Sequence, residues 1–343
     1  MAEGEIKGLI SRSGPMRTLR ISVGVIIGGI FIVLLLRNID FGTVSAIIGR
    51  AAAGPLLLAL VVYAADFVLR AIRYWVMLQA ATDRPLAMRP CIGPFIASFG
   101  ISDILPLRAG DGFRVVWFHR QFGIPVGVLI GTMLVERLLD LTAILILGGV
   151  ALILIGVSAP PMLVSGFQFV LAATFFAGIV IVFAPVLLAY IAERSALRIV
   201  ATPAAALLKA LHSTSMAVRQ MGSWRRLVFL MVFSLICWVL ESIVFLCAWW
   251  SLGGAAGEIA KPFLAFAFST LGTLVPSLPG HFGSFEYFGV QAFTLTGVDA
   301  TFAAAVVMLA HLVLWAPTAI FGVVWLLIGS ARPSASAEVR LQP

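Results

Sequence analysis

This chain contains six apolar segments, each long enough or nearly long enough to cross a membrane as a helix. The segments are residues 21–37, 55–80, 124–157, 167–191, 227–252 and 302–328. An α-helix needs about 20 apolar residues to cross the hydrocarbon core of a bilayer. Charged residues make up 11% of the chain, against about 25% in soluble domains. The pattern predicts an all-α, polytopic membrane helix bundle that forms a single integral-membrane domain over residues 1–343.

Lysine and arginine residues are concentrated in some of the connecting segments. The basic segments are the N-terminus, 81–90, 107–121, 193–226 and the C-terminal tail, whereas 38–53, 158–166 and 252–261 carry few basic residues. Basic loops of inner-membrane proteins stay in the cytoplasm, so we expect both termini and the segments 81–90, 107–121 and 193–226 there, in a bacterial inner membrane. The segments 38–53, 158–166 and 252–261 are expected outside. This distribution accounts for the net charge of +8, and no nucleic-acid partner is expected.

The stretch 275–289 interrupts an apolar region with Pro276, Pro279, Gly280 and Gly283. Prolines lack an N–H donor and clash with the preceding helical turn, and glycines allow the chain to reverse. Lipid does not tolerate the unpaired backbone groups of such a break, so it must be buried in protein or line a watery cavity. The alternative is an ordinary loop just outside the bilayer.

A second broken region precedes it, with Pro94 and Pro106 inside residues 91–121. The sides assigned to the loops are consistent only if residues 91–121 begin and end in the cytoplasm and residues 262–297 begin and end outside. We therefore expect about six full spans and two re-entrant hairpins that enter the membrane from opposite faces.

The two broken regions belong to an apparent internal repeat. Arg70 and Glu241 occupy the same place in two similar sequences, and a proline follows 36 and 35 residues later, at Pro106 and Pro276. The halves, 54–157 and 227–330, begin on opposite sides of the membrane, which makes the predicted repeat inverted. Inverted repeats with broken helices are typical of alternating-access transporters, which bind substrate where the repeats meet.

Several charged residues lie within the apolar segments, where each costs about 2.5–3.5 kcal/mol if it faces lipid. Glu136 and Asp140 share a helix face beside Arg137, and we expect all three inside the bundle. They form either a structural salt-bridge cluster or a site in which Arg137 meets a lipid phosphate while the carboxylates orient it or exchange a proton.

Arg70 and Arg73 lie in the second apolar segment. Arg73 either lies in the interior or snorkels toward the headgroups, and Arg70 is expected to pair with Glu241, Glu286 or Asp140. A glycine turn framed by charged residues at 108–114 either cradles an anionic headgroup or is a plain cytoplasmic loop.

Histidines complete the candidate site. His311, on an apolar helix, is either a hydrogen-bonded core residue or a proton relay, and His281 lies at the second break. The candidate substrate-binding residues are Arg70, Arg73, Arg108, Asp111, Arg114, Glu136, Arg137, Asp140, Glu241, His281, Glu286 and His311. The sequence contains no P-loop, paired CxxC, HExxH or GxSxG pattern, so no metal, cofactor or enzymatic activity is expected.

Four motifs together resemble the flippase-like integral-membrane domain of lysylphosphatidylglycerol synthases, which also occurs as a stand-alone protein. They are Leu69–Arg73, Leu105–Arg114, Glu136–Asp140 and Pro276–Glu286, in the family's order. The resemblance implies lipid translocation, with these polar residues around a headgroup cavity. The soluble aminoacyl-transferase domain has no counterpart in this sequence, so lysine transfer is not expected, and His311 stands where an arginine is expected in the family.

The leading hypothesis is a transporter or flippase that moves an amphiphilic lipid between leaflets. The arginines favour an anionic phospholipid, glycolipid or isoprenoid-type lipid. One alternative is a membrane-embedded lipid-modifying transferase, and another is a non-transporting scaffold that recruits enzymes of lipid or hopanoid synthesis through residues 193–226. A homo-oligomer and association with lipid-synthesis enzymes stay open.

Overall fold

The computed structural model confirms an all-α membrane helix bundle, and no strand occurs among the residues that it describes. The described residues are 14–37, 39–82, 85–156, 161, 164–174, 176, 214, 216–217, 220–221, 223–275 and 277–331. Pro276, most of the expected 167–191 span, most of the basic connector 193–226 and both chain termini lie outside them.

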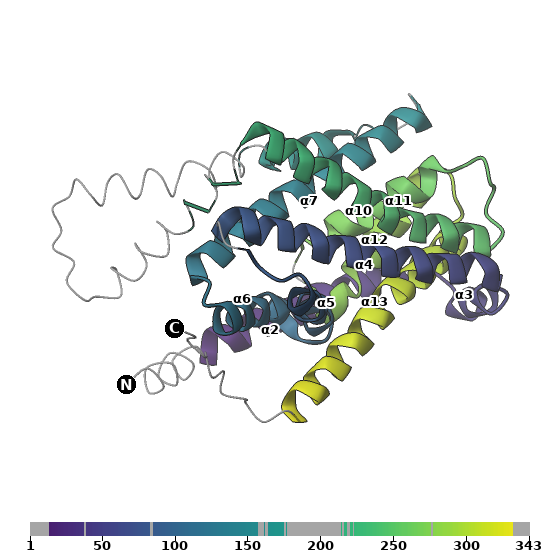
Figure 1. Ribbon diagram of the computed structural model, residues 1–343. Helices are drawn as coiled ribbons and strands as arrows, with labels where there is room; N and C mark the ends of the chain where they lie inside the picture. Colours follow the sequence, from purple (N-terminus) through teal and green to yellow (C-terminus); the bar gives the residue numbers. More distant parts are fainter. Residues whose placement is uncertain are drawn as a thin grey trace, which may run out of the picture.

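Among the described residues, four helices are long and apolar enough to cross a membrane: α4 (Ala53–Thr82), α7 (Val126–Ile155), α10 (Trp224–Ser251) and α13 (Ala300–Ala331). Figure 1 shows α4 and α10 running side by side through the bundle. A 30-residue helix such as α4 is roughly 45 Å long at 1.5 Å per residue, which exceeds the hydrocarbon core. These four helices match four of the six predicted spans.

Two further helices precede α4 in the part of the chain that the structure describes. The helix α2 (Gly14–Leu36) covers all but the last residue of the first predicted span and packs against the second broken region. The short helix α3 (Phe41–Ile48) follows, and the carboxylate of Asp40 caps its first turn by accepting a hydrogen bond from the backbone N–H of Gly42 at 2.9 Å. A carboxylate at this position satisfies an otherwise unpaired N–H of the helix start.

Each predicted broken region consists of two helices joined by a short 3-10 turn. The first consists of α5 (Arg89–Ile104), the 3-10 turn η1 (Pro106–Arg108) and α6 (Ala109–Phe122). The second consists of α11 (Ala260–Gly272), the 3-10 turn η2 (Pro279–His281) and α12 (Ser284–Leu295). The expected break at Pro94 is wrong: Pro94 lies inside α5. It lacks only the bond to the carbonyl four residues earlier, near the start of α5, and the helix continues.

Helices of the first half pack on helices of the second. The helix α5 lies against α13, and α7 lies against α11. At the α5–α13 crossing the backbones touch, since a Cβ atom on Gly100 would lie 1.9 Å from the carbonyl oxygen of Thr318. Small residues at helix crossings permit this close approach within membranes. The two broken regions are thus held by spanning helices of the opposite half.

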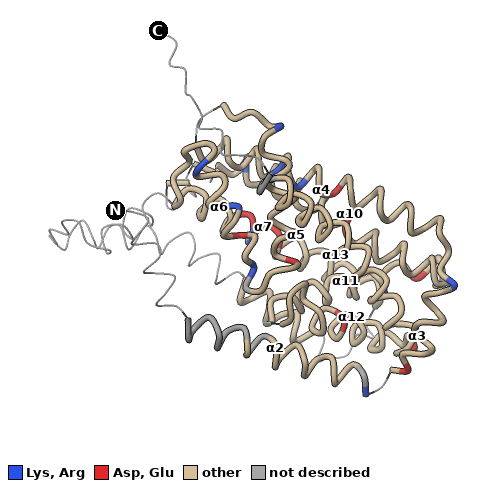
Figure 2. Tube along the Cα trace, turned by 90° about the horizontal axis from the view of Figure 1, so that it is seen from below, with Lys and Arg blue, Asp and Glu red and all other residues tan. Residues whose placement is uncertain are grey.

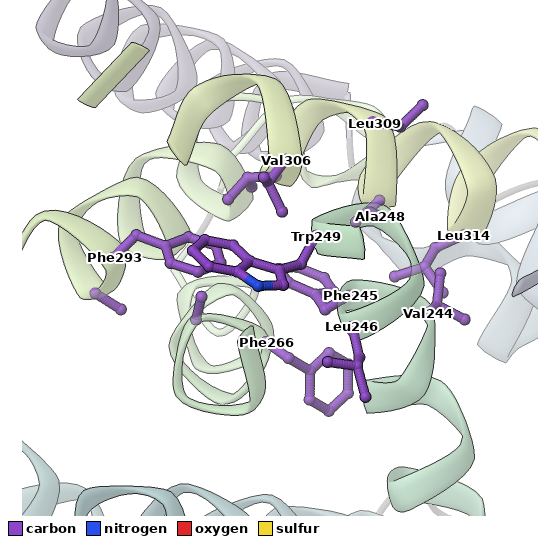
Figure 3. Close-up of a cluster of buried hydrophobic side chains, with 14 of the residues drawn as sticks. Val244, Phe245, Leu246, Ala248, Trp249, Phe266, Phe293, Val306, Leu309 and Leu314 are labelled. Carbon is purple, nitrogen blue, oxygen red and sulfur yellow. The ribbon is translucent and has the colours of Figure 1, made fainter. Parts of the chain in front are cut away.

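The largest apolar core joins α10, α11, α12 and α13 (Figure 3). The rings of Trp249 and Phe293 stack with centroids 5.4 Å apart and an interplanar angle of 10°. Phe245 and Phe266 meet edge to face at 5.5 Å. Outside this core many large apolar side chains are exposed on the helices, Ile153 by 79% among them. Apolar surface on this scale is typical of a protein surrounded by lipid.

Candidate functional site

Charged side chains from distant parts of the sequence gather in the interior of the bundle. Figure 2 shows acidic and basic positions close together around α5, α6 and α7, while the outer helices are mostly uncharged. A cavity of about 170 Å³ opens beside these charges. Its lining includes Tyr63, Arg70, Asp103, Arg108, Asp111, Arg137, Trp238, Glu241, His281, His311 and Trp315. Seven of the twelve predicted site residues therefore line one cavity.

Arg70 is shared by two carboxylates. Its Nε donates to Oδ2 of Asp66, one turn earlier on α4, at 2.7 Å, and its Nη2 donates to Oε2 of Glu241 on α10. The guanidinium also lies over the Trp238 ring, 4.2 Å from the centroid. Of the three partners expected for Arg70, the structure selects Glu241. We call Asp66, Arg70 and Glu241 the Arg70 triad.

Arg73 lies one turn further along α4 and is buried. Its Nη1 donates to Oδ1 of Asp140 at 2.5 Å and to Oγ of Ser234 at 2.6 Å. Its Nη2 lies 3.5 Å from Oε1 of Glu136. The side chain is 1% exposed, so the alternative in which Arg73 snorkels is wrong. Charges buried in this way need partners to offset the loss of hydration, and Asp140 supplies one from α7.

Arg114 on α6 is equally buried and joins the first broken region to α7. Its Nη1 donates to Oε2 of Glu136 at 2.9 Å, and its Nε donates to Oγ of Ser98 at 3.0 Å. The guanidinium lies 4.7 Å from the centroid of Phe95. Glu136 is thus held between Arg73 and Arg114, in the interior of the bundle.

Arg137 differs from its neighbours on α7. It pairs with Asp111 of α6 at 3.1 Å, yet its side chain is 40% exposed. The expectation of a fully interior position holds for Glu136 and Asp140 and is only half right for Arg137. Both members of this pair line the cavity and also an adjoining groove of about 320 Å³ between α6 and α7. The other residues of that groove are mostly apolar: Gly112, Val115, Ile130, Met133 and Leu134.

The tips of both broken regions carry side chains that line the cavity. The backbone of the residues that carry them is strained. Arg108 ends η1 with φ of 52°, and His281 ends η2 with φ of 62°. Positive φ costs a non-glycine residue roughly 1–2 kcal/mol, and such residues cluster at functional sites. Arg108 donates to the carbonyl oxygen of Thr273 at 3.3 Å. Among the described residues no carboxylate lies within ion-pair distance of Arg108.

Glu286 and His311 form a separate pair behind the second tip. Nδ1 of His311 lies 2.5 Å from Oε1 of Glu286, and Nε2 lies 3.0 Å from the carbonyl oxygen of Gly280. A carbonyl only accepts, so Nε2 carries a proton, and another proton lies between Nδ1 and the carboxylate. The pair is therefore neutral overall, either as two neutral groups or as two opposite charges. His311 is hydrogen-bonded, as one of its two predicted roles requires.

Several polar residues of the site were not among the predicted candidates, including Asp66, Asp103 and Trp238. Asp66 stands four residues before Arg70, a spacing at which opposite charges pair on a helix, and this signal was visible in the sequence. Asp103 accepts a hydrogen bond from the Thr318 hydroxyl at 2.7 Å. Trp238 donates from its indole nitrogen to Oδ1 of Asp140 at 2.9 Å. No sequence spacing connects either of the last two pairs.

The arrangement can hold an anion near Arg70, Arg108 and Arg137. It offers no cluster of three metal-ligating side chains among the described residues. Comparison with known proteins gives one family match: the model described as lysylphosphatidylglycerol synthase TM region covers residues 21–322. No curated protein matches the chain.

Proposed function

We propose, starting from the fact that the chain belongs to the family of the lysylphosphatidylglycerol synthase transmembrane region, that it moves an anionic amphiphilic lipid between leaflets. The observation that carries this proposal is Arg108, a cation on the cavity wall that forms no ion pair with a carboxylate among the described residues. Family membership supports a lipid-related membrane protein, and the charge pattern of the cavity supports the choice of an anion.

The electrostatics favour phosphate as the group that Arg108 binds. An arginine presents a planar, permanently charged fork that matches phosphate oxygens. A cation in a site of low dielectric is costly when unpaired, and an arriving anion removes that cost. Arg137 and Arg70 line the same cavity and bring further positive charge toward the same anion.

The dimensions of the cavity favour a headgroup with its chains outside. The volume of about 170 Å³ is below the roughly 300–1,000 Å³ typical of pockets that enclose a whole drug-sized ligand. The apolar groove between α6 and α7 shares Asp111 and Arg137 with the cavity. A lipid whose phosphate enters the cavity can therefore leave its acyl chains along α6, α7 and the surrounding bilayer.

For the route of the lipid across the membrane, we propose that both broken regions are re-entrant hairpins and that the two halves form an inverted repeat. Two features support this proposal. Residues from both tips line one cavity, and equivalent helices exchange partners, since α5 packs on α13 while α11 packs on α7. In transporters of this architecture one half rocks against the other around a central site. Both termini then face the cytoplasm of a bacterial inner membrane.

The test is lipid movement in proteoliposomes that contain a fluorescent phosphatidylglycerol analogue. Replacing Arg108→Gln should slow its movement roughly tenfold or more, because a hydrogen bond to a charged group is worth about 1.5–3 kcal/mol. The matched control is Arg89→Gln, since Arg89 is exposed at the start of the same broken region and its replacement should leave the rate unchanged.

Three other outcomes would contradict the proposed site or support an alternative function. Equal movement by wild-type protein and the Arg108→Gln variant would contradict the proposed site. Chemical conversion of the lipid by the purified protein would instead support the alternative of a membrane-embedded transferase. Absence of any movement, together with capture of lipid-synthesis enzymes through residues 193–226, would support the scaffold.

A further inference from the structure

The buried ion network carries one more negative than positive charge, and the excess lies in the Arg70 triad. Next to the triad, Arg73 and Arg114 balance Glu136 and Asp140, one cation for each anion. Within the triad, the single guanidinium of Arg70 faces the carboxylates of both Asp66 and Glu241. When both are ionised, the triad has a charge of −1.

Asp66 is buried deeply enough to make that charge costly. The exposed fraction of its side chain is 0%, and its Oδ1 has no hydrogen-bond partner among the described residues. A buried carboxylate without full compensation is strongly disfavoured. The cations that act on Asp66 are Arg70 and Arg73 of the same helix. Arg108 lines the same cavity as Glu241 and, among the described residues, forms no ion pair with a carboxylate.

We infer that the Arg70 triad takes up one proton, at Glu241, when an anionic headgroup binds Arg108, so that lipid movement is coupled to proton movement. This inference rests on the proposed function. The anion neutralises Arg108 and repels the nearby carboxylate of Glu241. A hydronium ion in the cavity then gives its proton to a Glu241 oxygen and becomes water. In the loaded cavity Arg108 balances the phosphate and Arg70 balances Asp66, so the charge that the anion brings is offset by the proton. The Arg137–Asp111 pair and Asp103, which accepts from the Thr318 hydroxyl, keep the charge they had before the anion bound.

Glu241 is the member of the triad that can exchange a proton with the cavity. Its side chain is 17% exposed and lines the cavity, whereas Asp66 is sealed inside the bundle. Protonation also weakens the attachment of Glu241 to Arg70, which leaves one side of that guanidinium free to turn toward the bound phosphate.

The surroundings of Glu241 match this role. The charged groups that act on it are Arg70 and Asp66 from α4, Asp140 from α7 and Asp103 from α5. The other helices packed on α10 contribute only paired groups among the described residues: Lys261 of α11 pairs with Glu258, and His311 of α13 pairs with Glu286. Three of the four groups that act on Glu241 are acidic, which favours uptake of a proton there.

The experiment measures protons taken up when short-chain phosphatidylglycerol is added to the purified protein in weakly buffered detergent solution. The phosphodiester of this lipid does not titrate in the range from about pH 5 to about pH 8, so a pH indicator reports the protein alone. Wild-type protein should take up about one proton for each protein chain that binds a lipid molecule. The affinity of the protein for the lipid should rise by up to about tenfold for each pH unit that the pH falls.

The variant Glu241→Gln is close in shape to the wild type and permanently uncharged at this position. It should bind the lipid with an affinity that does not change with pH, and without proton uptake. The matched control Glu258→Gln changes a glutamate that is paired outside the cavity, and it should behave as the wild type does. In proteoliposomes an imposed pH gradient should drive lipid movement by the wild type and not by Glu241→Gln.

The outcomes separate the two proposals. Lipid binding by the wild type without proton uptake, or undiminished uptake by Glu241→Gln, overturns the proton site and leaves the proposed function standing. Failure of both wild type and Glu241→Gln to bind the anionic lipid at any pH overturns the proposed function and the proton site with it.

Discussion

Removing the guanidinium of Arg73 tests whether the interior charges hold the bundle together. Arg73→Met keeps much of the side-chain length and deletes three ionic contacts, two to Asp140 at 2.5 and 3.2 Å and one to Glu136 at 3.5 Å. Glu136 keeps its contact with Arg114, whereas among the described residues Asp140 keeps only the indole N–H of Trp238. Removing one partner of a buried ion pair costs about 3–5 kcal/mol, and little solvent screening applies because these side chains are almost fully buried.

A second variant, Asp140→Asn, makes it possible to measure the interaction between Arg73 and Asp140 apart from their other contacts. Asp140→Asn alone leaves Arg73 with Glu136 as its remaining carboxylate and should also destabilise the protein. The double variant removes both members of the closest pair, so its loss should be smaller than the sum of the two single losses. For residues in direct contact we expect a coupling of about 0.5–3 kcal/mol.

The assay is the free energy of unfolding, measured by titrating the protein from mild detergent into a denaturing detergent while helicity is followed. Arg89→Met serves as the control, because an exposed residue changes stability by no more than about 0.5 kcal/mol. The reasoning fails if Arg73→Met is as stable as this control. It also fails if the two single losses add fully in the double variant, since Arg73 and Asp140 would then act independently.

Three further predictions concern topology, packing and capping. On a cysteine-free background, Thr82→Cys and Gln121→Cys should both react with a membrane-impermeant reagent from the same side, and labelling from opposite sides would contradict a re-entrant first hairpin. Gly100→Ala should cost more than about 1–3 kcal/mol of stability, because its Cβ would lie 1.9 Å from a backbone carbonyl oxygen of α13; Gly112→Ala, with open space around it, is the control. The pKa of Asp40 lies below its ordinary value, owing to hydrogen bonds from the side chain and backbone of the first turn of α3. Ionised Asp40 therefore stabilises this turn above the ordinary pKa, and heating curves should show that contribution disappearing as the pH falls through the lowered value, with no such change in Asp40→Asn.

The spanning helices and the two broken regions were predictable from sequence because the bilayer limits what a backbone can do. The helix α4 begins at Ala53 and ends at Thr82, within two residues of the segment identified by apolar length. Pro106 and Pro279 each begin a 3-10 turn at the tip of a broken region, because a proline cannot continue a regular helix from the preceding turn. The predicted break at Pro94 was wrong because a proline near the start of a helix removes little hydrogen bonding.

The pairing of charges was predictable only in outline. The cost of a charge in lipid indicates that Arg70 has a partner, but not that Glu241 is chosen over Glu286, which instead pairs with His311. That choice depends on how α4 lies along α10, two helices that are far apart in sequence. Asp103 gave no signal for a similar reason: its partner, Thr318, reaches it only because α5 and α13 touch at their glycines.

Several contacts that cross between the two halves are single hydrogen bonds, whereas the Arg73–Asp140 pair within the first half is bidentate. Around the cavity, Arg70 reaches Glu241, the Tyr63 hydroxyl donates to the carbonyl of Leu314, and Thr318 donates to Asp103. Each of these uses one donor on one acceptor, whereas Arg73 holds Asp140 through both terminal nitrogens. A bound anion competes with the first kind more easily than with the second, because one new charged partner can replace one existing hydrogen bond. A ligand shifts a conformational equilibrium only by its difference in affinity for the two states. If the chain moves lipid as proposed, we expect that difference to arise where the two halves meet.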